Sequence, residues 1–116
     1  MRLGKIWGTT EPLLVTPTIE LHRIQVEPEF KCSEHIHQYK WNAFYCVSGN
    51  IKICVRKNDY GLVDITSLRC GDMTTVAPNE YHWFETDAEE GAEVLEIYYP
   101  QHIGHDIVRK TVGEAL

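Results

Sequence analysis

Three histidines carry the clearest chemical signal in this sequence. His35 and His37 are separated by a single residue in "CSEHIHQYKWN", and His82 begins the later segment "HWFET". In an extended strand, residues two apart project from the same face, so the first two imidazoles can reach one ligand. Three imidazoles with open coordination positions are typical of a catalytic rather than a structural metal site. We therefore expect one divalent ion (Zn, Fe, Ni or Mn) held by His35, His37 and His82.

Asn42 is the expected fourth ligand. It lies where the next strand begins and shares a strand face with Phe44 and Cys46. Its amide oxygen can coordinate a cation but brings no negative charge, so the charge of the dication is left uncompensated. Such a site favours an anionic ligand, for example a carboxylate, a phosphate or an enediolate. The alternative is that Asn42 makes a hydrogen bond behind the ligands or serves as a turn residue.

The segments that must position these residues have the periodicity of strands. Alternation of apolar and polar residues predicts strands within residues 18–28, 42–57, 62–68, 73–78, 81–87 and 92–100. Within 42–57 we expect two strands joined by a tight hairpin at Gly49 and Asn50, which tolerate positive φ. Turn signals about every ten residues indicate an all-β sandwich or barrel. The segment after residue 100 suits a final strand or a short helix.

Size, charge and cysteine usage narrow the class of protein. A chain of 116 residues forms one domain. The net charge of -6 and the absence of a basic run argue against nucleic acid as a partner. No apolar leader or membrane-length stretch is seen, so we expect a cytoplasmic protein without membrane contact. The four cysteines lack CxxC spacing and a secretory context, and we expect them to be reduced thiols.

The spacing around the histidines resembles that of the cupins. The first cupin motif is matched by His35-x-His37, four residues, Asn42, six residues and Gly49. The second is matched by Gly71, five residues, "APN", two residues and His82. The resemblance covers about residues 19–99 and implies a double-stranded β-helix (jelly-roll barrel). The whole chain, 1–116, would then be a single cupin domain with a C-terminal tail at 100–116.

This sequence departs from the cupin motifs in three places. Asn42 replaces the usual glutamate, Ala77-Pro78-Asn79 stands where the family has Pro-x-Gly, and Thr86 stands where some members have asparagine. The change at 79 is mild, because asparagine adopts left-handed conformations more readily than other non-glycine residues. The change at 42 is the substantive one, since it removes the charged ligand.

A finer likeness is to the cupin domain of the mannose-6-phosphate isomerase group. It rests on "KIWGTTE", "HRIQVEP", "VSGNIKI" and "IGHDIVR". This resemblance implies isomerase- or epimerase-like proton transfer on a small anionic metabolite, a sugar or sugar phosphate. The general base is left open among Tyr98, Glu96 and Lys31. The alternatives are a non-catalytic sugar- or metabolite-binding module, an Fe(II)-dependent dioxygenase, and a subunit that works only beside a partner.

Four residues are predicted to contact the small-molecule substrate. Arg23 and Gln25 share a strand face and could point inward, where the arginine would pair with an anion. Tyr39 lies on the loop between the ligands, and Tyr98 lies on the last strand. If Arg23 faces the site, His22 faces away from it.

The apolar residues near the N-terminus predict a homodimer. Trp7, Ile19, Leu21 and Ile24 supply more apolar surface than one face of a small sheet needs. An N-terminal strand packed on a second copy would cover it.

Overall fold

A computed structural model of the chain describes residues 1–57, 61–100 and 106–116. These residues form eight strands and contain no helix, as expected for an all-β protein. The strands are β1 (Leu3–Lys5), β2 (Gly8–Val15), β3 (Glu20–Val26), β4 (Trp41–Arg56), β5 (Val63–Arg69), β6 (Met73–Val76), β7 (His82–Glu85) and β8 (Ala92–Tyr99). All of their pairings are antiparallel.

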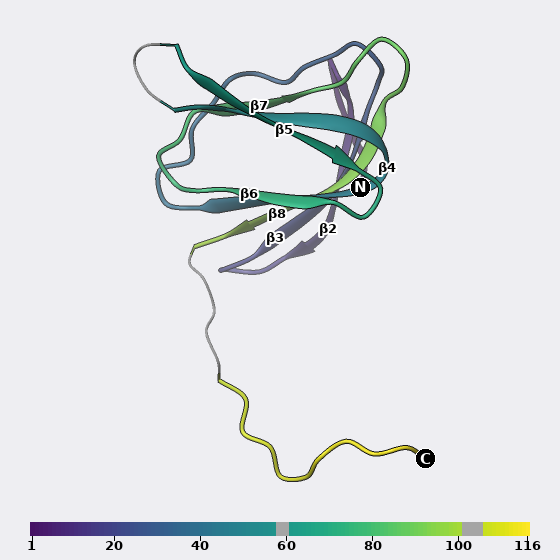
Figure 1. The fold of residues 1–116 in the computed structure, drawn as a ribbon, viewed down its shortest axis with the longest axis vertical. Helices are drawn as coiled ribbons and strands as arrows, with labels where there is room; N and C mark the ends of the chain where they lie inside the picture. The colour runs from purple at the N-terminus through teal and green to yellow at the C-terminus, as the bar shows by residue number, and fades with distance from the viewer. Residues whose placement is uncertain (58–60, 101–105) are drawn as a thin grey trace.

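Strand β4 belongs to two sheets that face each other (Figure 1). Its first half pairs with β8 and β6, and β8 continues through β3 and β2 to β1. Its second half pairs with β5 on one side and β7 on the other. The predicted jelly-roll fold is therefore confirmed, with β4 as the element that joins the two layers.

The expected hairpin at Gly49 is wrong. The chain does not reverse there but bends, with a register shift between Cys46 and Ser48 against β8. Gly49 has a φ of +81°, and a Cβ atom at this position would lie 2.0 Å from the carbonyl oxygen of Gly91. The glycine is needed for close passage of two strands at a bulge, and the same local signal also suits a hairpin turn.

The core lies between the two layers. It contains Ile24 and Val94 from one sheet and Ile51, Ile53 and Phe84 from the other. Trp7 packs its ring edge-on against Phe84, with ring centroids 5.0 Å apart. The segment between β1 and β2 thus covers one end of the interior.

The described part of the C-terminal tail has no regular secondary structure. Residues 106–116 form neither the strand nor the helix considered for the tail, and they are exposed and lie away from the barrel in Figure 1. Residues 101–105 of that segment lie outside the described residues. Within the described part of the chain, no helix is long and apolar enough to cross a membrane.

The homodimer stays a prediction, but the reason for it changes. Ile24 is fully buried within a single chain, and Trp7 is covered by Phe84, so neither needs a second copy. Strands β1 and β2 pair as an N-terminal hairpin. Other apolar side chains of this hairpin remain exposed, among them Ile6, Leu14 and Val15.

Candidate metal centre

The backbone places His35 directly opposite His82. The N–H of His35 donates to the carbonyl of His82 (3.0 Å), and the N–H of His82 donates to the carbonyl of His35 (2.9 Å). The N–H of Asn79 donates to the carbonyl of His37 (2.8 Å). Asn79 has a φ of +65°, the left-handed conformation expected for this position. Two distant segments are thereby joined at the histidines themselves.

The three imidazoles converge. Each of His35, His37 and His82 offers one ring nitrogen, and these nitrogens all lie within 4.8 Å of one another. A cation bound at about 2.1 Å holds its ligand atoms no more than about 4.2 Å apart, so small side-chain rotations bring the set into range. The centroids of the His35 and His82 rings are 4.5 Å apart.

Two of the rings are oriented by backbone carbonyls. The Nδ1 atom of His35 lies 2.7 Å from the carbonyl of Ser33, and that of His82 lies 2.9 Å from the carbonyl of Glu80. A carbonyl oxygen can only accept, so Nδ1 carries the proton and Nε2 keeps its lone pair. This arrangement is the one that metal-bound histidines generally have.

Buried polar atoms without a partner mark the same place. In the described part of the chain, four buried side-chain atoms lack a hydrogen bond, and three of them are His37 Nε2, His82 Nε2 and Asn42 Oδ1. A buried acceptor without a partner is costly, and each of these atoms has a lone pair suited to a divalent ion. The residues present therefore fit a metal ion.

Asn42 is buried beside the histidines and contacts an acid. Its side chain is 1% exposed, and its Nδ2 donates to Oε2 of Glu96 at 3.3 Å. Since Nδ2 is used in this bond, Oδ1 is the atom left for a cation. The structure thus contains both features weighed for Asn42, a free amide oxygen and a hydrogen bond behind the ligands.

Burial perturbs the acid–base properties of this cluster. It lowers the pKa of His37 to about 4, with repulsion from His35 and His82 adding to the effect. It raises the pKa of Glu96 to about 7, although a hydrogen bond from Tyr98 opposes the shift. Burial and the neighbouring Glu96 carboxyl also raise the pKa of Tyr98. The protein without metal therefore favours neutral imidazole and a phenol that keeps its proton.

A cavity of about 320 Å³ reaches the cluster at His35, whereas His37, His82 and Asn42 do not line it. It is lined on one side by Cys32, His35 and Phe84, and on the other by residues of the N-terminal hairpin, β3 and β8. These include Lys5, Trp7, His22, Glu96 and Tyr98. The volume suits a small ligand that touches both apolar and polar walls.

Of the four residues predicted to contact substrate, only Tyr98 lines the cavity. Tyr98 lines the cavity, and its ring centroid lies 5.1 Å from that of His37. Tyr39 is 80% exposed and does not line it. Arg23 and Gln25 lie on the opposite face of β3, because Ile24 and Val26 of that strand are in the core. Arg23 instead forms ion pairs with Glu11 (3.6 Å) and Glu93 (3.3 Å).

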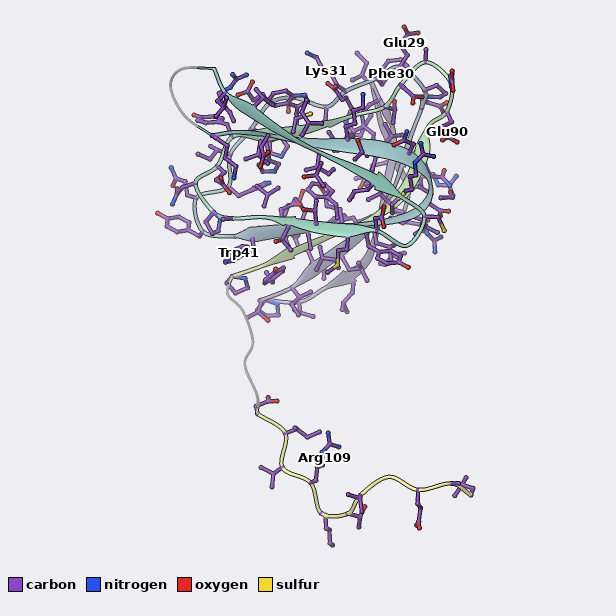
Figure 2. The ribbon with its side chains drawn as sticks, viewed as in Figure 1. Glu29, Phe30, Lys31, Trp41, Glu90 and Arg109 are labelled. Atoms are coloured by element: carbon purple, nitrogen blue, oxygen red, sulfur yellow. The ribbon has the colours of Figure 1, made fainter. Side chains whose placement is uncertain are left out.

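Sequence reasoning missed the inward position of His22. This residue shares its strand face with the buried Ile24 and lies edge-on to Tyr98, with centroids 5.9 Å apart. The alternation of Ile24 and Val26 with polar residues was the signal available for assigning that face. Among the residues considered as a general base, Glu96 and Tyr98 line the cavity, whereas Lys31 is exposed at the rim of the barrel (Figure 2).

An antiparallel jelly roll with a histidine cluster between its sheets defines a small β-barrel protein with a candidate metal centre. A family model described as "Cupin domain" matches residues 22–98. The chain belongs to the cupin family. No curated protein matches its sequence.

Solved structures share the fold at low sequence identity. KdgF from Halomonas sp. is 14% identical with a TM-score of 0.73, and the match covers 88% of this chain and 89% of that protein. A structure concerned with the Mn(II) centres of Bacillus subtilis oxalate decarboxylase is 16% identical with a TM-score of 0.74. CapF, solved with the inhibitor 3-isopropenyl-tropolone, is 14% identical with a TM-score of 0.78. The match to oxalate decarboxylase covers 90% of the present chain but only 28% of that protein. The match to CapF covers 87% of the present chain and 30% of that protein.

Proposed function

We propose that this protein is a metal-dependent cupin that catalyses proton transfer on a small anionic metabolite. The observation that carries the proposal is that His35, Glu96 and Tyr98 line one cavity. A proposed metal ligand, an acid able to exchange a proton and a phenol able to donate a hydrogen bond would therefore face the same bound molecule.

The metal ligands would be His35, His37, His82 and Asn42. A divalent cation held there would polarise a substrate carbonyl as a Lewis acid. The Mn(II) centres named for oxalate decarboxylase support keeping Mn among the metals considered, with Zn, Fe and Ni. All four ligand atoms are neutral, and Lys5 lines the same cavity. Both features favour an anionic substrate.

Glu96 is the proposed general base. Burial raises the pKa of Glu96 to about 7 in the protein without metal, and a cation held at Asn42 would favour the carboxylate, which is the form that removes a proton. Tyr98 would keep its proton and, on substrate binding, turn its O–H from Glu96 to a substrate oxygen. Tyr39, Arg23 and Gln25 have no role in this proposal.

A sugar or sugar phosphate is the proposed substrate class, and isomerisation or epimerisation the proposed reaction. Support comes from the sequence likeness to the mannose-6-phosphate isomerase group and from the size and polarity of the cavity. A cytoplasmic location and a homodimer belong to the same proposal.

Metal content and hydrogen exchange test the proposal together. We expect about one equivalent of metal in the purified protein, lost in His37→Ala and His82→Ala and kept in His22→Ala. We then expect the metal-loaded protein to incorporate deuterium from D₂O into at least one member of a panel of aldose and ketose phosphates, as followed by NMR. Glu96→Gln should abolish this exchange.

Other outcomes would favour the alternatives. Ligand binding without deuterium incorporation would indicate a binding module. Oxygen consumption by the Fe(II)-loaded protein, dependent on an added organic acid or sugar, would indicate a dioxygenase. A protein that is metal-free and indifferent to added divalent ions would contradict the metal site.

A further inference from the structure

Glu96 is a buried acid that forms no ion pair in the described part of the chain, although Lys5 lines the same cavity. Its residue is 8% exposed, and none of the ion pairs among the described residues includes it. An ionised carboxylate in such a place is costly unless it compensates a positive charge or accepts hydrogen bonds. Its position therefore needs an explanation beyond packing.

The strand register brings Glu96 to the amide of Asn42. On β4 and β8, Asn42 is paired with Tyr98, and Phe44 is paired with Glu96. Asn42 and Glu96 are thus diagonal neighbours on the inner face. The amide donates through Nδ2 to Oε2 of Glu96 at 3.3 Å.

This hydrogen bond decides which way the amide faces. A carboxylate only accepts, so it selects the NH₂ group of the asparagine and turns Oδ1 the other way. Oδ1 is buried without a hydrogen-bond partner, as are Nε2 of His37 and Nε2 of His82. The carboxylate therefore favours the rotamer in which a coordinating oxygen is available.

We propose that Glu96 is a positioning residue of the metal centre, which holds Asn42 with its amide oxygen toward the cation. This inference rests on the proposed metal binding at His35, His37 and His82. It assigns Glu96 a role in the protein without substrate, separate from its proposed role as a base. When Glu96 is ionised, it places a negative charge one hydrogen bond away from position 42.

Residues that orient metal ligands commonly contribute 10- to 100-fold in metal affinity. Co²⁺ is a suitable probe, because its visible absorption reports the number and geometry of its ligands. The protein would be stripped of metal and titrated with Co²⁺ in the absence of substrate. Thermal unfolding of each metal-free variant would show that it is folded.

Glu96→Leu removes the acceptor with little change in volume. We expect it to weaken Co²⁺ binding by about 10- to 100-fold and to change the visible spectrum. Glu96→Gln keeps a carbonyl acceptor without the charge, so it should weaken binding less than Glu96→Leu does. Glu93→Leu is the matched control, because Glu93 lies on the same strand and pairs with Arg23 on the other face.

A double-mutant cycle tests whether the effect passes through Asn42. In an Asn42→Ala background, Glu96→Leu should cause little further loss of affinity and no further spectral change. Equal losses in the two backgrounds would overturn the inference. So would a folded Glu96→Leu variant, or a Glu96→Gln variant if the leucine protein does not fold, with the affinity and spectrum of the wild type.

Different results would contradict the proposed metal binding itself. If the wild type does not bind Co²⁺, or if His37→Ala binds it as tightly as the wild type, the three-histidine site itself is contradicted. If the wild type binds, His37→Ala does not, and the Glu96 variants are unchanged, only the positioning role is lost.

Discussion

His35 and His82 exchange two backbone hydrogen bonds, of 3.0 and 2.9 Å, although they come from separate segments of the chain. This two-residue bridge extends the β4–β7 layer to the segment that also carries His37. The candidate metal ligands His35 and His82 are therefore held together by main-chain geometry.

Replacement of Gly49 should be strongly destabilising. A Cβ at Gly49 would lie 2.0 Å from the carbonyl oxygen of Gly91, and the φ of +81° adds strain. We expect Gly49→Ala to lower the free energy of unfolding by more than about 2 kcal/mol in urea titrations. Gly4→Ala is the control, since nothing lies within 4 Å of a Cβ there. Equal stability of the two variants would contradict the bulge.

The stability of the metal-free protein should depend on pH through His37. Its pKa is about 4 in the folded protein, against 6.5 for an ordinary histidine, so the unfolded chain binds the proton first. The contribution is fully present above pH 6.5 and is lost as the pH falls toward 4. His37→Gln should remove this loss, as measured by thermal unfolding across that range.

Glu96 changes the stability of the folded protein in the opposite direction to His37, over an overlapping pH range. Its pKa of about 7 in the folded protein, raised from 4.5, means that its contribution declines as the pH rises from 4.5 to 7. The difference between wild type and His37→Gln therefore isolates the histidine. If both proteins lose the same stability between pH 6.5 and 4, the neutral state of the half-buried His37 is not supported.

Trp7 should stabilise the wall of the cavity to which it belongs. Its ring lies edge-on to Phe84 at 5.0 Å and joins the N-terminal hairpin to the opposite layer. Trp7→Ala should lower the free energy of unfolding by about 2–3 kcal/mol, whereas Trp7→Phe should keep most of it. Urea titration of the two variants would check this. A loss below about 0.5 kcal/mol in Trp7→Ala would show that the contact contributes little.

A homodimer would cover the exposed apolar side chains of the N-terminal hairpin. Leu14 is 48% exposed and Val15 is 61% exposed, and β1 lies at the edge of its sheet. We expect light scattering to give twice the chain mass of 13.4 kDa, and Leu14→Glu to give the mass of one chain. Ile65→Glu, on the distant β5, should leave the dimer intact. A wild-type mass of 13.4 kDa would contradict the prediction.

Much of the fold follows from local sequence patterns. Alternation predicts β3, β5, β6, β7 and β8, because each lies between the interior and solvent and turn residues separate them. The behaviour of the chain at Gly49 does not follow, since a glycine in the left-handed region suits both a reversal and a bulge. The choice is made by the close approach of Gly91, which lies far along the sequence.

The site was predictable only in part, for a similar reason. The spacing of His35, His37 and His82 indicates the cluster, because side chains that bind one cation must lie on strand faces that point to the same place. The face of β3 that turns inward depends on its neighbours, since Arg23 is held outside by acids on β2 and β8. The contact of Glu96 with Asn42 likewise depends on the β4–β8 register, which the sequence of neither strand specifies alone.

The continuity of β4 has a mechanical consequence for the candidate metal centre. Asn42 is aligned with Tyr98 near one end of this strand, and Val55 is aligned with His82 near the other. A one-residue slip of β4 along its axis would displace Asn42 and the strand neighbour of His82 together. Deleting a single residue near the midpoint of β4 should therefore misalign Asn42 against His82, even if both sheets still form.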